Sequence, residues 1–281
     1  MAKQLHILNG DSTADLFVKS GLTGEIAVCR EFFCDGPLDF EVGSDVFWKK
    51  RYSFFEEEFN VGKLEYFDKS IKEFLKFEDL VAGSELVLWF EFDLFCQVNL
   101  LAICTFLLEN FRKDVSYYLV CTGYSKDKST LLSLSDYTAD EYAILYNDKV
   151  KITKHDLEFA KKCWEVFVKN EEQEIRSINF KGGKKFLYLE MAFEQHLNRF
   201  PKKNGLNQIE QLMVESIIES PKEAKEIVKM MLKWQHSNSV YGFGDLQYFW
   251  YLKKLKNLYT VSDSLYYINE KGMKLIENGN S

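Results

Sequence analysis

Three short groups of polar residues in this 281-residue chain each follow a run of apolar residues that is typical of a β-strand. In chain order the groups are Asn9-Gly10-Asp11-Ser12, Asp35-Gly36, and Glu91 with Asp93 and Gln97. Carboxylate oxygens bind hard divalent cations, whereas a serine hydroxyl and the free N–H groups at the start of a helix bind phosphate and other anions. These residue types therefore predict a site for a small anionic or nucleotide-like ligand.

Each of these residues is expected to have a role at such a site. We expect four residues to take part in chemistry on the ligand, namely Asp11, Ser12, Glu91 and Asp93. Three of them, Asp11, Glu91 and Asp93, are also the predicted metal ligands, with Mg²⁺ as the candidate cation. The predicted ligand-binding residues are His6, Asn9, Gly10, Asp35, Gly36 and Gln97. Metal-assisted hydrolysis or transfer of a phosphoryl group is the reaction that this set favours.

An ordinary structural role is the alternative for each group. Asp11 and Ser12 are residue types that cap the start of a helix, and Asp35-Gly36-Pro37 is typical of a turn. The acidic residues of the third group would suit the first turn of a helix, because its dipole favours negative charge. His6 lies inside a predicted strand, where a buried core histidine is commoner than a base. The functional interpretation is favoured because all three groups end at the same edge of one predicted sheet.

The order Gly10-Asp11-Ser12 after a first strand also resembles the GDS-type serine esterases, whose nucleophile is this serine. Such a serine needs a histidine base that a carboxylate orients. The Asp-x-x-His pair that these esterases carry near the C-terminus is absent, and His196 and His236 have no such partner in the sequence. A serine hydrolase is therefore the minor alternative.

The elements that must position these residues alternate between strands and helices along the first 135 residues. Strands are predicted at residues 5–8, 25–33, 84–90 and 115–122. The strands are separated by helical patterns, with two helices in residues 45–80 and another at 97–110. This alternation predicts an α/β domain with a mostly parallel, Rossmann-like sheet. We place its end at residue 135.

The rest of the chain is predicted to be mainly helical. Residues 136–204 form a helical linker region, with helices expected at 153–170 and 184–200. Residues 205–281 contain three helical patterns, two short strands and a final turn at 270–277. Three helices followed by a two-stranded hairpin predict a winged-helix-like domain, a relative of the helix-turn-helix.

The winged-helix-like end has two candidate kinds of partner, DNA and protein. Its third helix, which would enter a DNA groove, begins at Asp245. DNA bases are contacted by Arg, Lys, Asn or Gln near the start of such a helix. The expected exposed residues are Gln247 and, at the far end, Lys253, Lys254 and Lys256. This weak pattern favours contact with protein, so the alternative to an enzyme is a regulatory adaptor that senses a ligand and contacts protein or DNA.

The composition excludes a largely disordered chain. The protein is 46% hydrophobic and 16% aromatic, and no run approaches the length of about 18 apolar residues that crosses a membrane. We therefore expect a cytoplasmic protein without membrane contact. Six cysteines without a CxxC pair predict reduced core thiols. The formal charge is −7, with +2 in the last 81 residues, so only the C-terminal part is a candidate for nucleic-acid contact.

The ordered motifs resemble a bacterial family known only as a domain of unknown function. They are His6-x-x-Asn9-Gly10-Asp11-Ser12, Gly24-Glu25, Asp35-Gly36-Pro37 and Leu88-Trp89-Phe90-Glu91-x-Asp93-Leu94-Phe95-x-Gln97. The C-terminal part of the chain resembles the region that accompanies this domain in the family. Its motifs are Arg199-Phe200-Pro201, Gly205-Leu206, Glu210 and Gly244-Asp245-x-x-x-Phe249. The resemblance spans nearly the whole chain and implies that the strand-end residues are signature positions, but it implies no activity. Many relatives have His where this chain has Phe92, so a function that needs that histidine would be absent here.

Overall fold

The computed structural model describes residues 3–127 and 129–279. The chain divides into two compact units, residues 1–190 (unit 1) and residues 191–281 (unit 2). Most of residues 136–204, predicted as a helical linker region, therefore lies in unit 1. A strand and two helices of this stretch pack onto the sheet of that unit or onto its helices.

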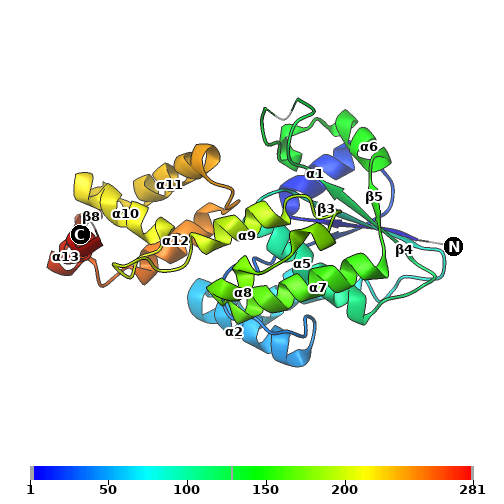
Figure 1. Ribbon diagram of the computed structural model, residues 1–281, viewed down its shortest axis with the longest axis horizontal. Coiled ribbons are helices and arrows are strands. Elements are labelled where there is room, and N and C mark those ends of the chain that lie inside the picture. Colours follow the sequence, from blue (N-terminus) through cyan, green and yellow to red (C-terminus); the bar gives the residue numbers. More distant parts are fainter. Residues whose placement is uncertain (1–2, 128, 280–281) are drawn as a thin grey trace. The chain divides into compact units, whose positions relative to one another are not determined.

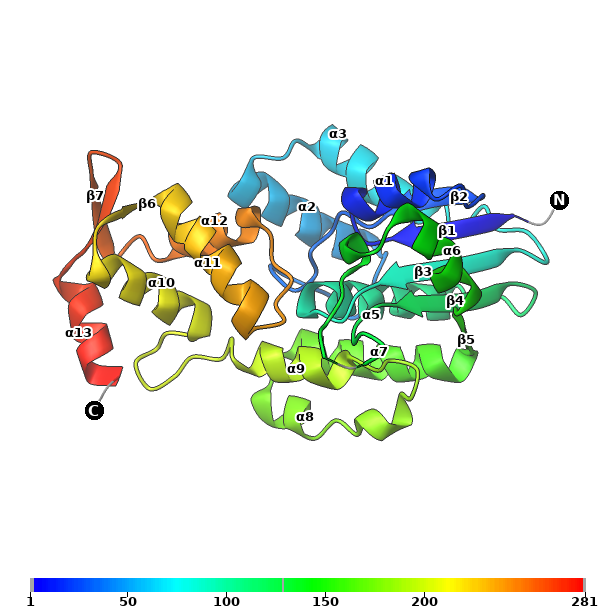
Figure 2. The ribbon, with the colours of Figure 1, turned by 90° about the horizontal axis from the view of Figure 1, so that it is seen from above.

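Unit 1 is built around a five-stranded sheet with the order β2-β1-β3-β4-β5. Its strands are β1 (Gln4–Leu8), β2 (Glu25–Val28), β3 (Glu85–Phe90), β4 (Ser116–Cys121) and β5 (Val150–Ile152). The first four are parallel, and β5 pairs antiparallel to β4 (Figure 2 shows the five strands in this order). The predicted α/β fold with a mostly parallel sheet is confirmed. The sequence did not predict β5, because three residues with two exposed side chains carry almost no strand pattern.

β2 is shorter than predicted: it ends at Val28, whereas the predicted strand ended at Phe33. Cys29 still donates its N–H to the Leu8 carbonyl of β1, and beyond it side chains replace the neighbouring strand as hydrogen-bond partners. The Phe33 N–H donates to Asn99 Oδ1 at 3.0 Å, and the buried Arg51 side chain donates to the Asp35 carbonyl at 2.6 Å. The same guanidinium pairs with the buried Glu31 carboxylate at 2.8 Å. The segment after β2 is therefore a fixed loop rather than a strand.

The outer edge of β2 is bonded by two side chains from a neighbouring helix, α4 (Lys72–Leu75), and the residue that follows it. The Val28 N–H donates to Glu73 Oε2 at 2.8 Å, and Lys76 Nζ donates to the Ile26 carbonyl at 2.7 Å. Lys76 and Glu73 also form an ion pair at 2.6 Å. These backbone groups of the edge strand are thus satisfied without another strand.

Helices cover both faces of the sheet. One face is covered by α1 (Asp11–Lys19) and α6 (Ala139–Asn147), and the other by α5 (Leu94–Glu109) and α7 (Lys154–Lys169) (Figure 1). α5 is apolar around nearly its whole circumference, as expected for a helix enclosed between a sheet and another helix. On the α1 and α6 face, Leu8, Phe17, Trp89 and Tyr142 form the centre of the core.

The segment that connects β2 to β3 contains two helical stretches, so the predicted pair of helices in residues 45–80 is confirmed. The first is α2 (Asp45–Phe59), which ends where Asn60 takes a left-handed conformation with φ 56°. The second consists of α3 (Lys63–Tyr66), one π-helical turn at Phe67–Ile71, and α4. The remaining short elements of unit 1 are the 3₁₀ turns Leu134–Asp136 and Phe180–Gly182 and α8 (Glu172–Arg176).

Unit 2 contains helices and a small antiparallel sheet with the order β6-β8-β7. The helix α9 (Leu189–Leu197) runs from the end of unit 1 into unit 2. The further elements are α10 (Gln208–Glu219), β6 (Lys222–Glu223), α11 (Ala224–Asn238), α12 (Asp245–Lys254), β7 (Tyr259–Ser262), β8 (Leu265–Ile268) and α13 (Glu270–Gly279). The hairpin turns through Asp263 and Ser264, both with positive φ, as tight hairpins require.

Three expectations for unit 2 are corrected. The predicted final turn is the helix α13, and the two-residue strand β6 was not predicted. Gln247, expected on the surface of the third helix, is 4% exposed. Its side-chain oxygen accepts the Gly244 N–H at 2.8 Å, which anchors the start of α12 instead of facing outward.

Among the described residues no helix combines the length and the apolar composition that crossing a membrane requires. The six cysteines, all within the described ranges, form no disulfide, and five of them are buried. The prediction of free core thiols is therefore confirmed for most of them.

Candidate functional site

Two of the three predicted groups meet at the carboxyl edge of the sheet, between β1 and β3. These neighbouring strands lead into helices on opposite faces, α1 after β1 and α5 after β3. Such a point, where successive connections leave in opposite directions, is where open α/β sheets bind ligands. The Asn9 side-chain amide donates to Cys96 Sγ at 2.8 Å, so the first residue after β1 touches the first turn of α5.

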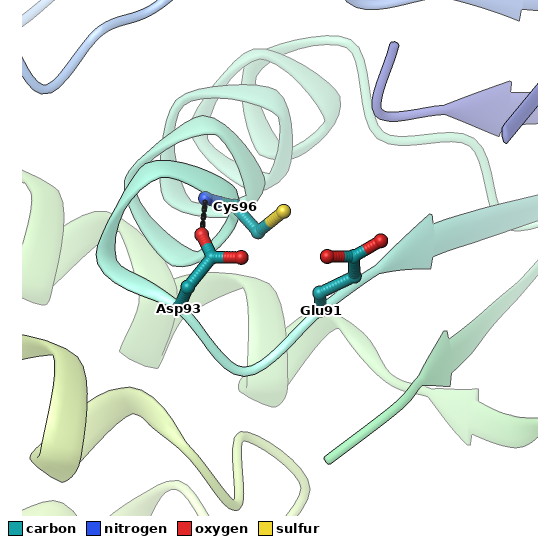
Figure 3. Close-up of side chains that lie close together, drawn as sticks. All are labelled: Glu91, Asp93 and Cys96. Carbon is teal, nitrogen blue, oxygen red and sulfur yellow. Dashed lines mark hydrogen bonds between the residues drawn. The ribbon is translucent and has the colours of Figure 1, made fainter. Parts of the chain in front are cut away.

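The centre of this edge is a group of three residues, Glu91, Asp93 and Cys96. One donor atom from each, two carboxylate oxygens and a sulfur, lies within 4.8 Å of the others. Figure 3 shows the Glu91 and Asp93 carboxyl groups directed toward each other, with the thiol beside them. Asp93 caps α5 by accepting the Cys96 N–H at 2.8 Å, and Glu91 accepts the Leu134 N–H at 2.9 Å. Both acids are therefore held in place by backbone donors.

Burial changes the proton affinity of both acids. Burial, with the neighbouring Asp93 charge as the next cause, raises the pKa of Glu91 to about 8. Burial also raises the pKa of Asp93 to about 6, although the Cys96 N–H opposes that shift. The half-buried Glu91 carboxylate and the buried Asp93 carboxylate repel each other when both are ionised. Near neutral pH the raised pKa values favour a shared proton or a bound cation on this pair.

Two buried oxygens beside this group have no hydrogen-bond partner within the described part of the chain: Gln97 Oε1 and Thr122 Oγ1. Gln97 is fully buried, and its Nε2 donates to the Glu91 carbonyl at 2.6 Å. Thr122 directly follows β4, and its N–H donates to the Phe90 carbonyl, which continues the β3–β4 ladder by one residue. Leaving a buried acceptor unpaired costs about 1–3 kcal/mol. Both oxygens therefore keep a free acceptor position in the described structure.

The start of α1 is open. Gly10 occupies the N-cap position with φ 105°, and in the described chain no side chain caps the helix. A Cβ at this glycine would meet nothing within 4 Å. Asp11 and Ser12 are exposed residues of the first turn, so the alternative that they cap α1 is wrong. The first backbone N–H groups of α1 are therefore available to an anion.

Asp11 does not join the Glu91 group but binds Arg30. The Arg30 guanidinium donates to both oxygens of the Asp11 carboxylate, at 2.8 to 3.1 Å. The Asp11 side chain is 68% exposed. Its negative charge is thus compensated in the structure. The sequence does not reveal Arg30 as a partner of Asp11, because Arg30 lies within residues 25–33, which predict a strand.

Asp35 and Gly36 lie in the loop after β2, Asp35 buried and Gly36 exposed, rather than in the group around Glu91. Asp35 is 3% exposed, and its carbonyl accepts from Arg51. Gly36 has φ 80°, and a Cβ there would lie 2.6 Å from the Phe54 ring. This position therefore needs glycine for a tight turn against a side chain, as the structural alternative expected.

His6 is a core residue, not an edge residue. Its Nδ1 accepts the Trp89 indole N–H at 3.1 Å, and its Nε2 bonds to the Thr23 carbonyl at 3.2 Å. Burial lowers the pKa of His6 to about 4. Both ring nitrogens are therefore engaged by the protein, which removes His6 as a ligand contact and as a base for Ser12.

Asn99, another residue that the sequence did not reveal, ties the edge to the loop after β2. Its amide donates to Asn9 Oδ1 at 2.9 Å and to the Glu31 carbonyl at 2.7 Å. Its oxygen accepts the Phe33 N–H. A fully buried asparagine in the middle of an apolar helix was the available signal, because buried amides are kept where they satisfy other polar groups.

An aromatic cover lies next to the acids. Phe92 contacts the ring of Tyr188, and the Tyr188 hydroxyl accepts the Tyr124 N–H at 2.9 Å. Gly123 lies directly under the same ring, and a Cβ there would overlap it at 2.0 Å. Phe92, at the position where the resemblance implies a histidine in many relatives, thus forms part of this aromatic cover in unit 1.

No protein-family model matches the chain, and no curated protein matches it either. The function must therefore be inferred from the geometry of the site.

Proposed function

We propose that unit 1 binds a small phosphate-bearing, nucleotide-like ligand at the edge between β1 and β3 and, with a divalent cation, hydrolyses or transfers its phosphoryl group. The observation that carries this proposal is the pair formed by the half-buried Glu91 and the buried Asp93, at the same sheet edge as the uncapped start of α1. The pair favours positive charge, and the helix start attracts negative charge. A phosphate with its cation satisfies both.

The proposal has two halves, binding of an anion (the anion half) and chemistry on its phosphoryl group (the chemical half). The anion half rests on the first turn of α1. Gly10 leaves the space beside the first N–H groups free of side-chain atoms, and the exposed Ser12 hydroxyl lies in the same turn. Arg30 neutralises Asp11, so this turn does not repel an anion. A glycine-led turn from a strand into a helix is a recurring phosphate site.

The chemical half rests on the acids. In hydrolysis, the oxygen of a water bonds to phosphorus, the bond from phosphorus to the leaving oxygen breaks, and a proton passes from the water to that oxygen. Glu91 and Asp93 would hold the cation that stabilises the charge of this transfer. The unpartnered oxygens of Gln97 and Thr122 would accept hydrogen bonds from the ligand or its water.

Two finer assignments belong to this proposal. The strand order, with the crossover point between β1 and β3, supports a Rossmann-like, doubly wound domain. The resemblance to the bacterial family stays a proposal; its motif residues Asn9, Glu91 and Gln97 lie at one edge of the sheet.

Thermal-shift measurements on the full chain test the anion half first. With chelator present, ADP and inorganic phosphate should raise the melting temperature of the parent. Ser12→Ala and Arg30→Gln should reduce the shift, because one removes a donor and the other leaves Asp11 uncompensated. Lys50→Gln is the matched control, since Lys50 is an exposed cation that pairs with Asp39 on another part of unit 1.

The chemical half is tested by phosphate release from ATP. Glu91→Gln should lower release at least about 100-fold if the cation is held as proposed, and Ser12→Ala should mainly weaken binding. The absence of any shift with phosphate ligands would overturn the proposed function, and equal shifts in the parent and in both site variants would remove the edge as its location.

A second candidate function is favoured for unit 2. We propose that the order α10-β6-α11-α12-β7-β8, with β8 between the other two strands, is a winged-helix-like module. Its third helix exposes Asp245 and Leu246 at the start and buries Gln247, so that turn offers no side chain suited to DNA bases. Contact with protein is therefore favoured over contact with DNA, as in a regulatory adaptor.

Filter binding with random duplex DNA at low salt separates these partners. Protein contact predicts no binding, and no difference between the parent and a Lys253→Glu/Lys254→Glu variant. Binding that falls steeply with salt and is lost in this variant would reassign unit 2 to DNA.

A further inference from the structure

We infer that Glu91, Asp93 and Cys96 form a site for a borderline divalent cation of the Zn²⁺ class rather than for Mg²⁺. This inference deepens the proposed function, because it names the cation of the same edge, and it replaces Asp11 by Cys96 in the ligand set. It rests on donor chemistry, on spacing, and on the two buried oxygens that lack partners.

The three donors lie close to coordination distance without a cation. Their atoms are within 4.8 Å of one another. Zn²⁺ binds carboxylate oxygen at about 2.1 Å and thiolate sulfur at about 2.3 Å, so neighbouring ligand atoms around it lie about 3.5 Å apart. The side chains therefore need to approach by only about 1 Å. All three come from one short segment that is fixed by the end of β3 and the first turn of α5.

The sulfur determines the class of cation. Cys96 Sγ accepts the Asn9 amide at 2.8 Å, so it already serves as an acceptor on the side away from the helix backbone. Thiolate is a poor ligand for Mg²⁺ and a good one for Zn²⁺ and its neighbours. Asp11, the third carboxylate that an all-oxygen site would use, is bound to Arg30 instead.

Two buried oxygens on residues next to the group have no hydrogen-bond partner among the described residues. Thr122 is 3% exposed and follows the Phe90–Cys121 pair of the β3–β4 ladder, so it is the cross-strand neighbour of Glu91 on the same face of the sheet. Gln97, fully buried, is anchored to the Glu91 carbonyl. Three protein ligands with a fourth position for water or substrate are typical of catalytic zinc sites. Thr122 Oγ1 and Gln97 Oε1 would be the oxygens left to bond what occupies that position.

Binding has a fixed proton balance. The Cys96 S–H bond breaks as the bond from sulfur to the cation forms, and this proton leaves to the buffer, as does any proton that Glu91 and Asp93 share. Cation uptake should therefore release protons and should tighten as pH rises.

Titration of the chelator-treated full chain with Co²⁺ alone tests the inference. We expect one equivalent to bind and to give the near-ultraviolet charge-transfer absorption of a cobalt–sulfur bond, which Zn²⁺ removes by displacement and millimolar Mg²⁺ does not. Cys96→Ser should lose this absorption and bind at least about 10-fold more weakly. Asp93→Asn should also weaken binding about 10-fold or more, while the asparagine continues to cap α5.

Cys104→Ser is the matched control, because Cys104 is another buried cysteine of α5 without a place in the group. It should bind Co²⁺ with the spectrum of the parent. No sulfur absorption, an unchanged spectrum in Cys96→Ser, or displacement by Mg²⁺ as readily as by Zn²⁺ would each overturn the inference. These outcomes are distinct from failure of the proposed function, because phosphate binding in chelator is measured without any cation.

Discussion

The side-chain amide of Asn9 donates its hydrogen bond to the sulfur of Cys96 across 2.8 Å. This contact joins the end of β1 to the first turn of α5, two segments that lie 87 residues apart in the chain. Since Asn9 Oδ1 also accepts from Asn99, one amide fixes the distance between the open start of α1 and the acids at the end of β3. The predicted anion and cation positions thus share a single rigid link.

Removing that link should destabilise unit 1. Asn9→Ala loses the donor to Cys96 and the acceptor for Asn99, and we expect the free energy of unfolding to fall by about 1–3 kcal/mol. Urea unfolding measures the change. Asn238→Ala, at the exposed end of α11, removes an asparagine bond that lies in solvent and should change stability by less than about 0.5 kcal/mol. Equal effects of the two variants would show that the link does not hold the edge together.

Asp11→Asn distinguishes a metal ligand from a first-turn residue. Because Asp11 faces Arg30 and not the other acids, removal of its charge should strengthen ADP binding in chelator about 2- to 5-fold. Isothermal titration measures this affinity. The predicted role of Asp11 as a cation ligand would instead require weaker Co²⁺ binding in Asp11→Asn, which the same instrument detects.

His6 should make the folded protein sensitive to acid. Its pKa is lowered to about 4 in the folded state from an ordinary value of 6.5, so the unfolded state binds a proton first as pH falls. Stability is therefore unaffected above about pH 6.5 and should fall by up to about 3 kcal/mol between pH 6.5 and 4. Urea unfolding over this range should show a shallower fall for His6→Gln than for the parent. His155→Gln, at an exposed histidine, should follow the parent.

Arg51→Met should be strongly destabilising. Arg51 and Glu31 are 0% and 1% exposed, and the loss of one partner leaves a buried charge uncompensated. We expect a loss of about 3–5 kcal/mol, measured by urea unfolding. The double variant Arg51→Met/Glu31→Gln should recover part of this loss. Lys50→Met, one residue earlier in an exposed ion pair, should cost less than about 1 kcal/mol.

Long apolar or alternating patterns predicted the fold of unit 1. Residues 84–90 gave β3 because a buried parallel strand is continuously apolar, and Asn60 gave the break between two helices. The sequence does not predict β5, because that strand is short and exposed. The predicted strand at residues 25–33 is longer than β2, because the loop after β2 takes its hydrogen bonds from Arg51 and Asn99. Such partners are distant in sequence, so no local pattern reveals them.

The candidate site was predicted only in part, for the same reason. Topology brought Glu91, Asp93 and Gln97 to the expected edge, because their positions depend on one strand end and the helix after it. Asp11 was diverted by Arg30, a partner 19 residues away. The apolar run around Cys96 predicts a core thiol, although its position in the first turn of α5 places it beside both acids.

The side chains that bond the outer edge of β2 also bear on how copies of this protein meet one another. An open strand offers its N–H and C=O groups to a strand of a second molecule, and sheets then grow from chain to chain. Here Glu73 and Lys76 already occupy the Val28 N–H and the Ile26 carbonyl, and they neutralise each other in doing so. One ion pair on a short helix thus occupies two of the backbone groups through which a strand of a second copy would have to pair at this edge.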